Sequence, residues 1–188
     1  MMVPLYALVF LLTGKIYILL LLSPMALLIL AGTVVTTSLV MPLTFTWILY
    51  RRKVISSFSL SQTEDRTIPI VVTAVFYYLL FYLMKQVQML PSYYIFILCL
   101  ILLMLCALLV NLRWKISLYM LGAGALTAFI AGMGIKYEMN VALPLTITLV
   151  LSGLSGTFRL LNDKHSPAQV YAGFISGFVT VFWVYTMI

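Results

Sequence analysis

Charge is scarce in this chain of 188 residues: 8% of the residues are charged and 64% are hydrophobic. A soluble domain carries about a quarter charged residues, so a water-soluble globular protein is excluded. The lack of polar or repetitive tracts also excludes disordered, collagen-like and coiled-coil chains. Since one membrane-spanning helix takes about 20 residues, the composition predicts an all-α, polytopic membrane helix bundle of about six to seven helices, forming one domain over residues 1–188.

Histidine, cysteine and acidic residues are also rare, with one, two and four copies respectively. His165 is the single histidine, which excludes a two-histidine mechanism. No group of residues has the spacing of metal ligands, so we expect no metal and no other cofactor. Cys99 and Cys106 lie in one apolar run without polar neighbours, which favours packing roles over redox chemistry.

Apolar runs broken by charged or turn residues predict where the chain crosses the membrane. The expected spans are residues 3–22, 26–50, 68–84, 93–111, 116–134, 141–158 and 167–188. Loops alternate sides, so the polar segments 51–67, 111–116 and 159–166 share one side, hereafter face A. Face A carries eight of the eleven basic residues, namely Arg51, Arg52, Lys53, Arg66, Arg113, Lys115, Arg159 and Lys164. The positive-inside rule makes face A cytoplasmic, and the net charge of +7 fits orientation and lipid headgroup contact rather than nucleic acid.

Small residues recur at helix-packing spacing in the last three spans. They are Ser152 and Gly156, Gly173 and Gly177, and Gly122, Gly124, Gly132 and Gly134. Such residues let helix backbones approach closely in lipid, so we expect these three helices to form the tight part of the bundle.

His165 stands at the start of the last expected helix, where Ser166 suits the N-cap and Pro167 the first turn. A helix N-terminus attracts anions, and Arg159 can add a bidentate contact to a phosphate. An imidazole there can attack phosphorus, and Gln169, one turn later, can orient it by a hydrogen bond. The alternative is a surface histidine in a basic loop.

Two further segments of face A bring phosphate-type donors to the start of a span. Arg66 precedes the third span, and Lys115 with Ser117 precedes the fifth. The alternative for Arg66 and Lys115 is interfacial anchoring, which is common for basic residues at span ends. We expect His165, Arg159, Arg66 and Ser117 to converge within one pocket.

The segment around His165 resembles the third motif of the type 2 phosphatidic acid phosphatase superfamily, roughly Ser-Arg-x5-His-x3-Asp. Arg159 and His165 match it, and Gln169 stands in place of the aspartate. The resemblance, to a divergent bacterial branch, covers about residues 45–188. It implies a metal-independent enzyme of the bacterial inner (cytoplasmic) membrane that hydrolyses a phospholipid or polyprenyl phosphate.

The first and second motifs of that family are matched more loosely. Ser117 and Tyr119 fall on the serine and the histidine of the second motif, so a tyrosine replaces a histidine. Lys53 and Arg66 resemble a stretched first motif. The resemblance implies His165 as nucleophile. The remaining implied roles are Gln169 as its orienting group, Tyr119 in the place of the leaving-group acid, and Arg159, Arg66, Ser117, Lys115 and Lys53 as the phosphate-binding set.

Two replacements leave an alternative function open. Gln169 cannot stabilise an imidazolium by charge, and the phenol of Tyr119 is a weaker acid than an imidazolium. The alternative is a catalytically impaired family member that acts as a lipid-binding or structural membrane subunit. A transporter or channel is less favoured because, Lys15 apart, no acidic or basic residue lies in the middle of an expected span.

Overall fold

The computed structural model describes residues 24–56, 64–86, 91–111, 113–114, 116–162 and 165–187. Over these residues the fold is all-α, and six helices are long and apolar enough to cross a membrane. The protein is therefore an integral membrane protein with a polytopic helix bundle, as its composition predicts. The expected first span, residues 3–22, lies outside the described residues.

The first described crossing is one helical rod in three segments, α2 (Pro24–Val35), η2 (Thr36–Val40) and α3 (Met41–Arg51). In η2 the helix widens to a π turn, in which the backbone N–H of Met41 bonds to the carbonyl of Thr36. Pro42 follows and has no N–H to offer the carbonyl four residues earlier, so the regular α-helical ladder is interrupted at this point.

The other five crossings are α4 (Glu64–Gln86), α5 (Pro91–Asn111), α6 (Leu118–Lys136), α7 (Ala142–Leu161) and α8 (Pro167–Met187). Together with the first rod they confirm the last six expected spans, with ends shifted by a few residues. The clearest shift is at α4, which begins at Glu64 rather than at residue 68 and keeps Pro69 inside the helix.

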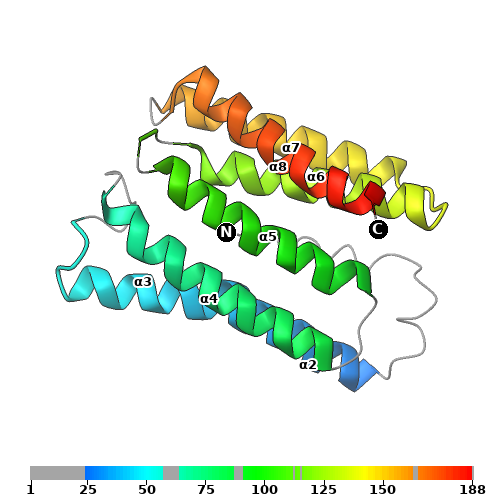
Figure 1. The fold of residues 1–188 in the computed structure, drawn as a ribbon, viewed down its shortest axis with the longest axis horizontal. Helices are drawn as coiled ribbons and strands as arrows, with labels where there is room; N and C mark the ends of the chain where they lie inside the picture. The colour runs from blue at the N-terminus through cyan, green and yellow to red at the C-terminus, as the bar shows by residue number, and fades with distance from the viewer. Residues whose placement is uncertain are drawn as a thin grey trace.

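The helices lie roughly along one axis and alternate in direction (Figure 1). The end of α3, the starts of α4, α6 and α8, and the ends of α5 and α7 all lie at the left-hand end of the bundle in that view. This arrangement confirms face A. Lys85 and Lys136 lie in the last turns of α4 and α6, at the opposite end.

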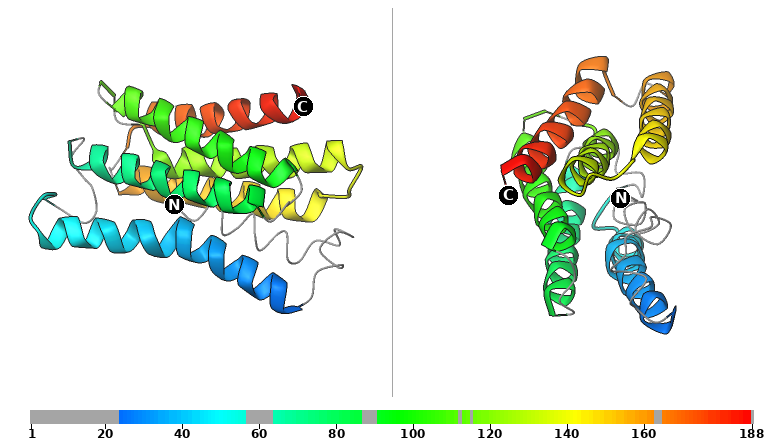
Figure 2. Two further views of the ribbon diagram at one scale, coloured as in Figure 1. Left: turned by 60° about the horizontal axis from the view of Figure 1, so that its bottom comes forward. Right: turned by 90° about the vertical axis from the view of Figure 1, so that its right-hand side faces the viewer.

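α6 is the buried centre of the bundle and packs most extensively against α8, while α7 covers another side of it (Figure 2). α4 pairs with α5, and α5 contacts both α6 and α8. Phe129 of α6 joins them, with its ring 4.3 Å from that of Phe96 in α5 and 5.5 Å from that of Tyr185 in α8. Cys99 is buried as a packing residue should be, but Cys106 is exposed, so the packing role predicted for it is wrong.

Glycines bring the backbones of α6 and α8 into direct contact. A Cβ at Gly124 or at Gly177 would overlap a carbonyl group of the facing helix. A Cβ at Gly173 would lie 2.8 Å from the carbonyl oxygen of Ser117, just before α6. The small-residue prediction is confirmed for this helix pair, and the pair holds the first turns of α6 and α8 side by side.

A valine at Gly177 should therefore destabilise the bundle, whereas the same change at Gly153 should not, because Gly153 faces open space. Forcing a side chain into a packed contact costs about 1–3 kcal/mol. Thermal unfolding of Gly177→Val and Gly153→Val in one detergent measures the difference. Equal unfolding temperatures for the two variants would contradict the close α6–α8 contact.

Candidate functional site

The start of α8 is closed by a reciprocal pair of hydrogen bonds between Ser166 and Gln169. The backbone N–H of Gln169 donates to Ser166 Oγ at 3.4 Å, and the backbone N–H of Ser166 donates to Gln169 Oε1 at 3.1 Å. Together with Pro167 as the first helical residue, this is the capping box that a Ser-x-x-Gln sequence favours. The predicted N-cap is confirmed, and it places His165 directly before the helix.

Gln169 also sets the orientation of the imidazole. His165 Nδ1 lies 3.1 Å from the same Oε1 atom. The backbone N–H of Ser166 can only donate, so the Gln169 atom that it meets must be the acceptor oxygen. Nδ1 must then carry a proton, which in a neutral imidazole leaves the lone pair on Nε2. His165 is only 9% exposed, which disagrees with the alternative of a surface histidine in an open loop.

Ser117 carries a buried hydroxyl at the start of α6. Its backbone N–H donates to the carbonyl of Gln169 at 3.4 Å, which ties α6 to the first turn of α8. Its side chain is fully buried and does not cap α6, and among the described residues its Oγ has no hydrogen-bond partner. An unsatisfied buried polar group lowers the stability of a folded protein by about 1–3 kcal/mol. A ligand atom that accepts a hydrogen bond from Ser117 Oγ would remove this penalty.

Two arginines from different helices come together beside this hydroxyl-bearing turn. Arg66, in the first turn of α4, is 8% exposed. Arg159, in the last turn of α7, is close enough for the two positive charges to repel each other. Guanidinium groups match the geometry of carboxylate and phosphate oxygens, so two of them from different helices could together hold an anionic ligand.

Tyr119 lies against Arg159. The guanidinium carbon of Arg159 is 3.7 Å from the centroid of the Tyr119 ring, over its face. Such a cation–π contact is worth about 0.5–1 kcal/mol when exposed and more when it is desolvated. The contact joins α7 to α6. Through Ser117 and Gln169, α6 is joined in turn to α8.

The two lysines of the predicted phosphate-binding set are placed differently. Lys115 lies outside the described residues. Lys53 is exposed just beyond α3, at a left-handed backbone angle (φ 59°), and its backbone closes the helix by a bond to a last-turn carbonyl. The same loop is held to α4 because the backbone N–H of Ser56 donates to the carboxylate of Asp65 at 3.1 Å. Among the described residues, no contact of Lys53 with the arginine pair is seen.

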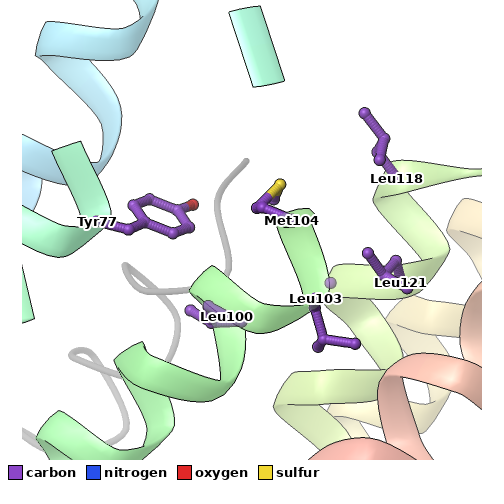
Figure 3. Close-up of a pocket in the computed structure, with 7 residues that line it drawn as sticks. Tyr77, Leu100, Leu103, Met104, Leu118 and Leu121 are labelled. Carbon is purple, nitrogen blue, oxygen red and sulfur yellow. The ribbon is translucent and has the colours of Figure 1, made fainter. Parts of the chain in front are cut away.

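A small cavity lies between α4, α5 and α6 (Figure 3). Its lining is mostly apolar and consists of Tyr77, Leu100, Leu103, Met104, Leu118, Leu121 and Gly122. Its volume of about 10 Å³ is close to the space of a single water molecule. It is a packing void in the bundle, and the residues expected to share a pocket form a separate cluster at the end of the bundle.

Pairwise contacts link six of the eight candidate residues: His165 with Gln169, Gln169 with Ser117, Tyr119 with Arg159, and Arg159 with Arg66. Their convergence within one pocket stays a prediction. Two features escaped the sequence analysis: the capping box, which the Ser-x-x-Gln spacing signals, and the stacking of Arg159 on Tyr119, which no local pattern signals. Comparisons with protein-family models, curated proteins and solved structures give no match to this chain.

Replacing Ser117 by alanine should stabilise the ligand-free protein and weaken phosphate binding. The variant removes an unsatisfied buried hydroxyl, so the free energy of unfolding should rise by up to about 1–3 kcal/mol. Ser176→Ala is the matched control, because Ser176 Oγ already donates to the carbonyl of Ala172 at 2.7 Å. Unfolding experiments and titration with inorganic phosphate measure both effects. A less stable Ser117→Ala protein, or one with unchanged phosphate affinity, would contradict a ligand-binding role.

Proposed function

We propose that this protein is an integral-membrane lipid phosphatase that hydrolyses a lipid phosphomonoester or diphosphate through a phosphohistidine. The observation that carries the proposal is that contacts link the ends of four helices to one oriented imidazole. His165 contacts Gln169 in α8, and Ser117 before α6 bonds to Gln169. Arg159 of α7 stacks on Tyr119 of α6 and lies near Arg66 of α4. The resemblance of these residues to the phosphatase motifs supports the same assignment.

The phosphate is bound by charge and by hydrogen bonds. Arg66 and Arg159 offer guanidinium groups that fit phosphate oxygens, and an anion between them relieves their repulsion. Ser117 Oγ, which has no hydrogen-bond partner in the part of the chain that the structure describes, donates a hydrogen bond to a phosphate oxygen. The start of α8 adds the partial positive charge of a helix N-terminus.

The reaction follows from the tautomer of His165. Nε2, which carries the lone pair, attacks phosphorus. The P–N bond forms while the bond from phosphorus to the lipid oxygen breaks, and that oxygen takes a proton from Tyr119 or from water. Water then attacks phosphorus, the P–N bond breaks, inorganic phosphate is released, and the proton of the water passes to solvent. Throughout, Gln169 Oε1 accepts a hydrogen bond from the Nδ1–H of His165. The dipole of the Gln169 amide thereby stabilises the positively charged ring in place of a carboxylate.

A lipid is the substrate that suits this position. The cluster lies at the end of a membrane helix bundle, where a headgroup meets water (Figure 1). Phe158 and Leu161, on either side of Arg159 in α7, are exposed apolar side chains. A phosphate bound by Arg159 would therefore have apolar surface beside it for a lipid tail. Phospholipid and polyprenyl phosphates of the bacterial inner membrane are the proposed substrates.

A second candidate function is a membrane subunit that binds lipid phosphate without turnover. The presence of Tyr119 at the position of the second-motif histidine favours it, because the chain then lacks the usual acid for the leaving group. The binding site would be the same in both cases. Only the chemical step distinguishes the two candidates.

Phosphate release from dioctanoyl phosphatidic acid and from farnesyl diphosphate, without added metal, tests the proposal. His165→Ala should reduce release to the uncatalysed background. Arg66→Gln should weaken substrate binding by about 10- to 100-fold, the value expected for a lost charge-assisted hydrogen bond. Lys136→Gln, at the opposite end of the bundle, is the charge-matched control and should change neither.

Turnover that survives in His165→Ala would refute the nucleophile assignment. Binding of both lipids without phosphate release by the wild-type protein would favour the non-enzymatic subunit.

A further inference from the structure

Tyr119 occupies the first turn of α6, two residues after Ser117, and its ring meets Arg159 from the last turn of α7. The contact is made by the face of the ring, with the guanidinium carbon 3.7 Å from the centroid. The hydroxyl is at the edge of the ring and takes no part in this contact. Tyrosine, phenylalanine and tryptophan share such a face, whereas only tyrosine carries the phenolic hydroxyl.

The ring of Tyr119 restricts the position of the Arg159 side chain. That side chain is long and flexible, and Arg66 repels it through like charge. The ring of Tyr119 supplies an attraction that opposes this repulsion before any phosphate is present. Arg159 is therefore held beside Arg66 in the arrangement that binds an anion, and less ordering remains to be done when the ligand arrives.

The geometry points to Tyr119 as a positioning residue that acts through Arg159, rather than as the acid that protonates the leaving group. This inference rests on the proposed function, since the anion bound by Arg159 is taken to be the phosphate of the lipid. It changes the role that the family resemblance implies for position 119. The departing lipid oxygen then takes its proton from water, and hydroxide from that water is neutralised by the proton released when water cleaves the phosphohistidine.

Replacing the hydroxyl and the ring separately distinguishes the two roles. Tyr119→Phe removes only the hydroxyl, and Tyr119→Leu removes the aromatic face. Dioctanoyl phosphatidic acid is the probe, with affinity measured by calorimetry and phosphate release measured on the same proteins. Tyr119→Leu should weaken binding and raise KM by about 3- to 30-fold, the loss of one partly desolvated cation–π contact, with a much smaller change in kcat.

Tyr119→Phe should retain the affinity that Tyr119→Leu loses. Tyr82→Leu is the control for loss of an exposed tyrosine, because Tyr82 is 52% exposed near the opposite end of α4. In an Arg159→Ala background, Tyr119→Leu should cause no further loss, since the two side chains act as one unit. Unfolding temperatures of all variants identify any that fail to fold.

Two results would overturn the inference. One is a Tyr119→Phe protein whose affinity and phosphate release fall as far as those of Tyr119→Leu. That result would assign the function to the hydroxyl. The other is an undiminished effect of Tyr119→Leu in the Arg159→Ala background. Because binding needs no turnover, a protein that binds the probe and shows the coupling without releasing phosphate supports the positioning role and refutes only the phosphatase. A wild-type protein that does not bind the probe would refute both.

Discussion

The direct backbone contact between α6 and α8 is the constraint on which the rest of the structure depends. In lipid, helices gain little from burying apolar side chains against one another, so close packing through small residues has to supply the attraction. Gly124, Gly173 and Gly177 allow that approach. It places Ser117 beside the first turn of α8 and lets its N–H reach the carbonyl of Gln169. The imidazole and the buried hydroxyl are thereby positioned by the same contact.

The cluster at face A brings together groups that suit an anion. Arg66 and Arg159 carry like charges close to each other, and Ser117 Oγ has no hydrogen-bond partner among the described residues. An anion with several acceptor oxygens would be attracted by both arginines and could accept a hydrogen bond from the hydroxyl. The proposed phosphate site gives both features a role. The stacking of Arg159 on Tyr119 and the capping box of α8 are local interactions that hold the cluster in the absence of ligand.

The crossings and the shared face were predictable because they follow from local properties. A run of about 20 apolar residues is long enough to span a bilayer. Because successive loops lie on alternate sides of the membrane, the number of spans then determines on which side each loop lies. The pairing of His165 with Gln169 follows from their spacing around one helix turn. The proximity of Arg66 to Arg159 was expected from their common place on face A, but the sequence does not show that α4 and α7 bring these two side chains close together. The contact of the Tyr119 ring face with Arg159 depends on the rotamers of two residues far apart in the sequence, so no local pattern predicts it. The position of Lys53 depends on its backbone hydrogen bond to the carbonyl of Tyr50 at the end of α3.

The single histidine allows the central claim to be tested directly. Nitrogen-15 NMR of protein labelled only in histidine reports one imidazole, that of His165. The contact with Gln169 requires a proton on Nδ1. The proposed nucleophile further predicts a lone pair on Nε2 and predicts that the Nε2 resonance moves most when inorganic phosphate is added. A proton on Nε2 in the ligand-free protein, or a ring that does not respond to phosphate, would contradict an imidazole aligned toward an anion between Arg66 and Arg159.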